Sequence, residues 1–167
     1  MSLKTGNLKL VLSEKRPEEI EQIAKDPRVE PFLTEKWMYP EGMPESMEFT
    51  IYENGEVIGQ IALKSIRWFN RKAELSLFLK PAFQGRRLGG KLLESMMDYA
   101  FGELNLYRLE AEVLGYNQKA IKMVEMLGFT LEGKLRQAKY HEGKYYDIFR
   151  YGILKHEFDV YYKERNS

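Results

Sequence analysis

The chain has no cysteine among its 167 residues and only two histidines, His141 and His156. The absence of cysteine excludes a disulfide framework, a thiolate zinc site and a cysteine nucleophile. Neither histidine stands at a spacing from a serine or an acidic residue that suggests a catalytic triad, and a G-x-S-x-G motif is absent. We therefore expect the protein to have no metal-binding site, and we expect His141 to be exposed at a polar hairpin tip.

Long apolar runs and an excess of charge of one sign are also missing. No run approaches the roughly 20 apolar residues that a membrane-spanning helix needs, and the N-terminus lacks the pattern of a signal peptide. Lys and Arg total 26 against 25 Asp and Glu, so the net charge of +1 provides no global field for nucleic acid or an anionic membrane. We expect a cytoplasmic protein without a nucleic-acid or membrane partner.

The composition is that of an ordinary globular protein. Hydrophobic residues make up 44% of the chain and charged residues 31%. A chain of 167 residues is long enough to bury one core. Neither a shift in composition nor an internal repeat divides it, so we predict a single domain over 1–167.

The expected elements alternate between hairpins and helices. Asn54-Gly55 tolerates positive φ and predicts a hairpin between strands 48–52 and 57–66. Pro81 ends a further strand. The other expected strands are 8–12, 73–79, 106–114, 129–135 and 145–154; the expected helices are 17–25, a long one after residue 87, and 117–127, with one short helix in an irregular segment at 28–46. This order predicts an α/β (α+β) fold with a mixed, mostly antiparallel sheet flanked by helices.

The turn between strand 73–79 and the long helix is rich in glycine and arginine. It reads "QGRRLGG" from Gln84 to Gly90. A helix N-terminus offers unpaired N–H groups and a partial positive charge, glycines let an anion approach the backbone, and arginines suit phosphate oxygens. The turn is therefore either a tight connection and nothing more or a seat for phosphates.

Two familiar phosphate motifs are excluded at this turn. There is no G-x-x-x-x-G-K-[ST], so the turn is not a P-loop. The glycines do not fall as G-x-G-x-x-G, and the turn does not belong to the first strand–helix unit, which disfavours a dinucleotide-binding fold.

A second stretch, "NQKAIKMVEMLGF" from Asn117 to Phe129, decides between the two interpretations. Q-x-x-x-x-G at 84–89, followed by N-x-x-A-x-x-x-x-x-x-L-G-F at 117–129, resembles the GNAT superfamily of acetyl-CoA-dependent N-acetyltransferases. "AELSLFLKPAFQGRRLGGKLLESMMDYAF" and "GKLRQAKYHEGKYYDIFRYGIL" look most like the branch that holds the ribosomal-protein N-terminal and spermidine acetyltransferases. The resemblance follows the order of elements over nearly the whole chain and is specific from about Glu74 to Phe129.

The resemblance implies a GNAT-like sheet splayed between two parallel strands that hold acetyl-CoA. Backbone groups on the strand before the turn would meet the pantetheine arm, the loop would wrap the pyrophosphate, and the end of the next strand would touch the cofactor. The residues that match these positions are Leu77, Phe78 and Leu79; Gln84, Gly85, Arg86, Arg87, Leu88, Gly89 and Gly90; and Asn117.

Two positions depart from the family pattern. The family loop is usually written Q/R-x-x-G-x-G/A, and its fourth position here is Arg87. If that residue must adopt left-handed geometry, the strain costs about 1–2 kcal/mol. Many members carry a tyrosine on the later helix to protonate the departing thiolate, and that position here is Val124.

Acetyl transfer to an amine needs a base, and Glu74 is the candidate. It opens the strand before the turn, where similar enzymes often place a carboxylate; the alternative is a solvated charge at a strand end. The backbone N–H of Phe78 or Leu79 is the family's usual donor to the carbonyl oxygen. For the acid, three alternatives stay open: a tyrosine among Tyr116, Tyr140, Tyr145 and Tyr146, a water molecule, or no catalysis at all.

The segment before the first hairpin is the candidate acceptor site. It places Glu30, Glu35, Glu41 and Glu45 near Trp37 and Tyr39. Carboxylates beside aromatic rings can attract a cationic amine, and Glu30 is the residue we assign to the substrate, although most of this set also fits an aromatic loop with surface charges. An amino-sugar nucleotide would instead use Arg28 and Lys36 for its phosphates.

The resemblance thus predicts an N-acetyltransferase that moves an acetyl group from acetyl-CoA to a primary amine: a protein N-terminus, a polyamine or an amino sugar. The alternative is an acetyl-CoA-binding relative without catalysis, acting as a sensor or scaffold. The C-terminal "HEFDVYYKERNS" fits either a frayed tail or a homodimer contact.

Overall fold

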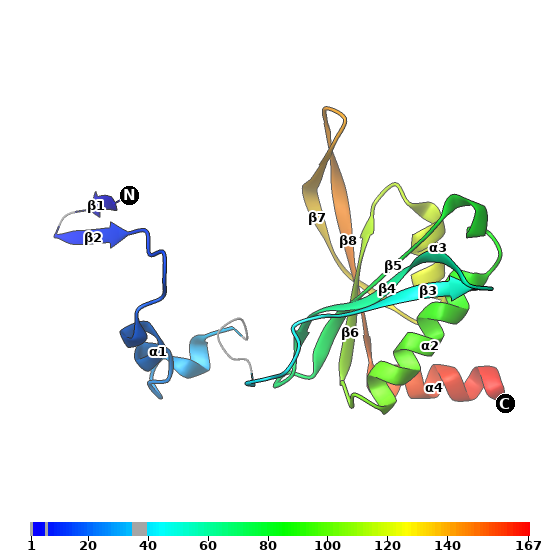
Figure 1. The fold of residues 1–167 in the computed structure, drawn as a ribbon, viewed down its shortest axis with the longest axis horizontal. Coiled ribbons are helices and arrows are strands. Elements are labelled where there is room, and N and C mark those ends of the chain that lie inside the picture. Colours follow the sequence, from blue (N-terminus) through cyan, green and yellow to red (C-terminus); the bar gives the residue numbers. More distant parts are fainter. Residues whose placement is uncertain (1, 6, 35–39) are drawn as a thin grey trace. The chain divides into compact units, whose positions relative to one another are not determined.

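The computed structural model describes residues 2–5, 7–34 and 40–167. It divides into two compact units, Met1–Met38 and Tyr39–Ser167, which are described separately below (Figure 1). Parts of the predicted acceptor segment, namely Glu35, Lys36, Trp37 and Tyr39, lie outside the described residues.

The described residues of the N-terminal unit form a small hairpin and two short helices. Strands β1 (Ser2–Thr5) and β2 (Leu8–Val11) pair antiparallel, and β2 confirms the expected strand at 8–12. Helix α1 (Glu18–Ala24) has three glutamates in its first turn, where carboxylates favour the helix dipole. The 3₁₀ helix η1 (Glu30–Phe32) is the short helix expected in the segment 28–46.

The larger unit is built on a six-stranded sheet in the order β3-β4-β5-β6-β8-β7. The strands are β3 (Met47–Glu53), β4 (Glu56–Arg67), β5 (Lys72–Leu79), β6 (Arg108–Leu114), β7 (Thr130–His141) and β8 (Lys144–Leu154). Within this sheet β5 and β6 pair parallel and every other pair is antiparallel. The predicted mixed, mostly antiparallel sheet is therefore confirmed.

Three helices cover one face of this sheet: α2 (Leu88–Gly102), α3 (Gln118–Met126) and α4 (Lys155–Asn166) (Figure 1). The core forms where they meet alternate residues of the strands. On β6, for example, Leu109, Ala111 and Val113 are buried. The side chains in between lie on the opposite face, hereafter the polar face, which carries Lys72, Glu74, Arg108, Glu110, Glu112 and Arg150. No helix in the described ranges has the length and apolar character to cross a bilayer.

The C-terminal segment is not a frayed tail, because it forms α4. Phe158 on this helix is buried and packs against Phe101 of α2 with ring centroids 5.2 Å apart. The backbone N–H of Leu154 donates to the Glu157 carboxylate at 3.0 Å, which fixes the start of the helix. The sequence of α4 is mostly polar, so its short apolar stripe does not predict a helix. The stripe is recognised only from the packing of Phe158 in the core.

The hairpin β7–β8 is longer than the expected strands at 129–135 and 145–154. Pairing continues to His141 and Lys144, past a register shift between Leu135 and Lys139. Gln137 has a φ of 51°, and its N–H donates to the Asp147 carboxylate at 2.9 Å, so the irregularity is held in place. The polar stretch and the bulge interrupt the period-2 pattern that would have predicted this part of the strand. As expected, His141 is exposed near the tip.

Candidate active site

Strands β5 and β6 separate soon after they start to pair. Their parallel register runs from Lys72 opposite Arg108 to Glu74 opposite Glu110 and then stops. A cavity of about 190 Å³ lies in this region. Its walls come from β5, β6, α2 and α3 and consist of Glu74, Leu75, Ser76, Leu77, Leu93, Ala111, Glu112, Val113, Ala120, Met123, Val124 and Phe129.

Separation of the strands leaves the β6-facing edge of β5 without a strand partner after Glu74. Alternate residues of a strand direct their N–H groups to the same edge, so this stretch can donate hydrogen bonds into the gap. Of the predicted cofactor residues on β5, Leu77 lines the cavity and Phe78 is 60% exposed. The Leu79 carbonyl accepts a hydrogen bond from the Gln84 side chain at 2.9 Å, which ties the following loop to the strand.

The loop from Gln84 to Gly90 leads directly into the N-terminus of α2. Gly85 has a φ of 76°, and Arg87, the N-cap residue, has φ 60° and ψ 16°, so both adopt left-handed geometry. Arg87 therefore adopts the left-handed geometry considered in the sequence analysis, and the backbone strain described there applies to it. No side chain caps α2 and its first turn holds no acidic residue. Its first N–H groups therefore stay available to an anion.

The two glycines at the start of α2 have different surroundings. A Cβ on Gly89 would lie 3.1 Å from the Met123 methyl carbon of α3, so this buried glycine allows the two helices to approach closely. A Cβ on Gly90 would meet nothing within 4 Å. Gly89 thus has a packing role in addition to the predicted contact with the cofactor.

The two loop arginines also differ. Arg86 forms an ion pair with Glu53 of β3, with Nη1 and Oε2 3.3 Å apart, and its guanidinium lies 4.7 Å from the centre of the Phe83 ring. Arg87 is exposed. Binding of a phosphate by Arg86 would therefore compete with Glu53.

Asn117 lies between β6 and α3 and caps the helix. Its side-chain oxygen accepts a hydrogen bond from the Ala120 N–H at 3.2 Å, which makes Asn117 the N-cap of α3. The cap uses only the oxygen, so the amide nitrogen can serve as a donor to a bound molecule. The predicted contact of Asn117 with the cofactor stays a prediction.

Glu74 is half-buried on the polar face and lines the cavity. Burial raises the pKa of its carboxyl group above the usual range, and the nearby negative charge of Glu112 raises this pKa further. Arg150 and Lys64 act in the opposite direction. A carboxylate with a raised pKa is better matched to proton abstraction near neutral pH.

Val124 is buried in the cavity wall. None of the four candidate tyrosines lines this cavity; they form two ring pairs instead, Tyr116 with Tyr146 at 4.8 Å and Tyr140 with Tyr145 at 5.3 Å. These rings thus contact one another and not the cavity. Glu30 lies in η1 of the N-terminal unit, and its assignment to the substrate stays a prediction.

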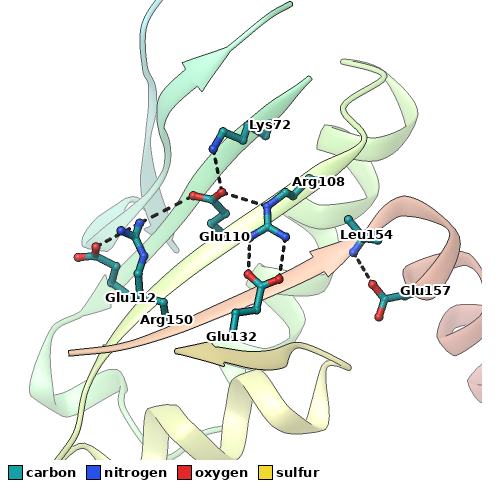
Figure 2. Close-up of polar contacts among 8 residues, drawn as sticks. All are labelled: Lys72, Arg108, Glu110, Glu112, Glu132, Arg150, Leu154 and Glu157. Atoms are coloured by element: carbon teal, nitrogen blue, oxygen red, sulfur yellow. Dashed lines mark hydrogen bonds and ion pairs between the residues drawn. The ribbon is translucent and has the colours of Figure 1, made fainter. Parts of the chain in front are cut away.

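Sequence reasoning missed Glu112, the second carboxylate in the cavity wall. The signal was available, because in "RLEAEVL" Glu110 and Glu112 alternate with the buried Leu109, Ala111 and Val113. Arg150 of β8 was missed as well. Its Nη2 atom lies 3.3 Å from Oε1 of Glu112 and 3.8 Å from Oε2 of Glu110, so it bridges the two (Figure 2).

Glu110 is the centre of this polar network. Its Oε1 atom accepts hydrogen bonds from Nε of Arg108 at 3.0 Å and from Nζ of Lys72 at 3.1 Å (Figure 2). Burial raises the pKa of Glu110, but the hydrogen bonds and positive charges of Arg108 and Lys72 together outweigh that effect and lower this pKa overall. All parts of the network come from neighbouring strands, and the antiparallel register places Arg150 directly opposite Glu112.

Arg108 extends the network to β7 through a bidentate pair with Glu132. This pair raises the pKa of Arg108 and lowers that of Glu132. It passes over Gly152 of β8, where a Cβ would lie 2.8 Å from Nη1 of Arg108. The glycine is therefore needed for the two side chains to meet across the strand between them.

Comparison with known proteins gives one family and several relatives. The family model described as "Acetyltransferase (GNAT) domain" matches residues 6–149, which include parts of both units. Spermidine N(1)-acetyltransferase from Escherichia coli (strain K12) is 34% identical over 110 residues, covering 66% of this chain and 59% of that protein. The putative ribosomal N-acetyltransferase YdaF from Bacillus subtilis (strain 168) is 31% identical over 113 residues, covering 68% and 62%.

Solved structures give the same result for the fold. Mutant forms of the spermidine/spermine N-acetyltransferase SpeG from Vibrio cholerae superpose with a TM-score of 0.68 at 28% identity, covering 71% of this chain and 72% of that one. A dodecameric structure of spermidine N-acetyltransferase from the same organism gives a TM-score of 0.66 at 30% identity, covering 68% and 67%. The matched part of this chain spans 59% and 62% of the length of the two curated relatives.

Proposed function

The chain belongs to the acetyltransferase (GNAT) family, and from this premise we propose that it transfers an acetyl group from acetyl-CoA to a primary amine. The family match and the relatives named as spermidine and ribosomal N-acetyltransferases confirm the resemblance seen in the sequence and the branch to which it pointed. The observation that carries the proposed activity is the cavity between β5 and β6 with Glu74 in its wall.

Three features support a site for acetyl-CoA on this chain. The uncapped N-terminus of α2 and the two arginines before it offer donors and charge to a pyrophosphate. The unpaired edge of β5 offers backbone hydrogen bonds to an extended arm. The cavity is lined mostly by apolar side chains, which suits a thioester. We assign the cofactor contacts to Leu77–Leu79, Gln84–Gly90 and Asn117.

The proposed reaction is direct attack of the amine on the thioester. Glu74 takes a proton from the acceptor ammonium, and the neutral amine nitrogen forms a bond to the carbonyl carbon while backbone N–H groups of β5 stabilise the oxygen. The carbon–sulfur bond breaks, and the sulfur takes up a second proton that the nitrogen releases. The proton on Glu74 then passes to solvent, so each turnover yields an amide, a thiol and one proton.

No tyrosine of the described residues lines the cavity, and a water molecule is therefore the carrier that we propose for the second proton. A thiol of ordinary pKa is a fair leaving group, so a dedicated acid is the part of the site that is most easily dispensed with. A cation is the acceptor that suits the acidic wall of Glu74 and Glu112. Spermidine, which appears in the names of the Escherichia coli relative and the Vibrio cholerae structure, meets this requirement, and so does a peptide N-terminus.

The cavity-lining Val124 favours a second candidate function, binding of acetyl-CoA without catalysis. A protein of this kind would act as a sensor or scaffold. The two functions differ in one measurable quantity, the release of free thiol in the presence of an acceptor.

Thiol release from acetyl-CoA with a panel of acceptors tests the proposal. The panel holds spermidine, peptides with free Ala, Ser or Met N-termini, aminoglycosides and a 4-amino sugar nucleotide. We expect turnover with a cationic acceptor, and we expect Glu74→Gln to lower kcat by roughly 10²–10⁴-fold. Glu48→Gln, which removes an exposed carboxylate from β3, is the matched control and should retain activity. Binding of acetyl-CoA without turnover of any acceptor would favour the sensor or scaffold.

A further inference from the structure

Glu74 and Glu112 face the same cavity from neighbouring strands but have different partners. Glu112 is paired with Arg150 at 3.3 Å, whereas Glu74 forms no ion pair in the described part of the chain. The residues opposite Glu74 on its two neighbouring strands are Lys64 of β4 and Glu110 of β6. Two carboxylates in one site with different surroundings are suited to different tasks.

The ion-paired network beside Glu74 is electrically balanced without it. Among the ion pairs of the described residues it holds three cations, Lys72, Arg108 and Arg150, and three carboxylates, Glu110, Glu112 and Glu132, which sum to zero. Glu74 is therefore not required as a counter-charge for these groups and can be protonated without breaking an ion pair.

Arg150 is the member of this network that connects it to the cavity. Its guanidinium contacts Glu110, which two further cations hold, and Glu112, which lines the cavity (Figure 2). The register fixes this arrangement, because Arg150 lies opposite Glu112 on β8. Glu110 and Glu132 have other cationic partners, but Glu112 has only Arg150 among the ion pairs of the described residues.

We propose that Glu112 and Arg150 complete the acceptor end of the site: Glu112 holds the acceptor ammonium while Glu74 takes its proton, and Arg150 is the positioning residue that keeps Glu112 at the cavity. This inference rests on the proposed acetyl transfer and deepens it. The proton moves from the ammonium nitrogen to a Glu74 oxygen, and Glu112 stays charged beside Arg150. The site therefore selects acceptors that arrive as cations.

The charge arrangement is testable on the full chain without acetyl-CoA. Titration of protein labelled with ¹³C at the glutamate carboxyl carbons, with the Glu74 signal assigned through Glu74→Gln, follows this group directly. Removing the cation in Arg150→Gln leaves the network with one net negative charge, so Glu74 should titrate at higher pH than in the wild type. Removing the carboxylate in Glu112→Gln should shift the Glu74 titration to lower pH.

Two further variants control this titration. Arg150→Lys keeps the charge and should leave the Glu74 titration close to that of the wild type, although a lysine cannot contact both carboxylates with the planar geometry of arginine. Arg165→Gln removes an arginine from another exposed ion pair, with Glu94 on α2, and should leave it unchanged. If Arg150→Gln does not fold, Glu112→Gln and Arg150→Lys still carry the measurement. A Glu74 titration that does not move in Glu112→Gln overturns the proposed arrangement.

Steady-state kinetics test the division of roles. Glu112→Gln should raise KM for a cationic acceptor by about ten-fold or more, because one charge-assisted contact is lost, and should change kcat less. Glu74→Gln should show the opposite split, and Arg150→Gln should resemble Glu112→Gln. An unchanged KM in Glu112→Gln would remove it from the acceptor site.

The outcomes separate this inference from the proposed function. Turnover with an unmoved Glu74 titration keeps the acetyltransferase and overturns the role of Arg150. Shifted titrations without turnover of any amine overturn the acetyltransferase, and with it the acceptor role of Glu112, while supporting the electrostatic link between Arg150 and Glu74.

Discussion

Arg87 occupies a backbone conformation that an arginine rarely adopts. Its φ of 60° places it in the left-handed region, at the position where the family pattern has glycine. Left-handed geometry costs a residue with a Cβ about 1–2 kcal/mol relative to its right-handed form. The strained residue also places a positive charge at the N-terminus of α2, which is where we expect the pyrophosphate.

Replacing Arg87 with glycine should separate the strain from the charge. We expect Arg87→Gly to raise the free energy of unfolding by up to about 1 kcal/mol, since strain relief is partly offset by glycine's greater entropy when unfolded. Arg87→Ala keeps the strain and removes the charge, so it is the matched control. Urea denaturation gives the stability difference. A glycine variant no more stable than the alanine variant would show that the loop relaxes around Arg87.

The contribution of Glu74 to stability should depend on pH. Its pKa is raised in the folded protein, so the folded state binds this proton more tightly than the unfolded state does. The ionised carboxylate therefore destabilises the fold, and the loss appears as pH rises from the ordinary glutamate value of about 4.3 through the higher folded value. Below both values the group makes no difference.

We accordingly expect Glu74→Gln to be more stable than the wild type at neutral pH and no more stable at acidic pH. Thermal unfolding of both proteins across this range measures the difference, with the exposed Glu48→Gln as reference. A stability gain in Glu74→Gln that is the same at every pH would come from packing, and would contradict the titration argument.

At the scale of elements, the junction between β6 and α3 combines two tasks in one side chain. The Asn117 oxygen caps α3, and we propose that its amide nitrogen contacts the cofactor. The helix is only 9 residues long, and short helices depend on their caps and on tertiary packing. Stability and ligand affinity should therefore respond differently to different substitutions here.

Serine keeps a capping oxygen and lacks the amide, whereas alanine lacks both. Asn117→Ala should lose about 1 kcal/mol of stability, and Asn117→Ser should lose much less. Both should bind CoA more weakly than the wild type if the amide contacts it. Chemical denaturation and calorimetry measure the two properties. Equal CoA affinity in all three proteins would leave Asn117 with the cap alone.

At the scale of the whole molecule, the last helix returns the C-terminus to the central core. Phe158 is 3% exposed and packs on α2, although its helix follows the final strand. Phe158→Ala should lower the free energy of unfolding by about 3–5 kcal/mol through lost burial and a residual cavity. Val160→Ala, at a position 55% exposed on the same helix, should have little effect. A small loss in Phe158→Ala would mean that α4 does not complete the core.

The features that could be predicted from the sequence are those determined by residues close together in the chain. The Asn54-Gly55 hairpin, the strand expected at 106–114 and the helix expected at 117–127 follow from short-range backbone and burial preferences, and the structure confirms them. The α4 helix depends on a distant partner, Phe101, and the full length of β7 depends on a bulge that Asp147 holds. Pairing of Arg150 with Glu112 depends on strand register, which neither strand's own sequence reveals.

The short junction between β5 and β6 also has a consequence for how the chain folds. Strands β3, β4 and β5 are consecutive in sequence, as are β6, β7 and β8. In the described part of the chain, the strand pairing between these two halves of the sheet consists of the three residue pairs from Lys72–Arg108 to Glu74–Glu110. The meander β3–β4–β5 and the hairpin β7–β8 form from contacts between neighbours in the chain. The junction between β5 and β6 must close a loop that contains α2, and the pairing of β6 with β8 must close one that contains α3 and β7. We expect both closures to come late in folding, so that the proposed acetyl-transfer site is assembled when β6 joins the two early-formed hairpin segments.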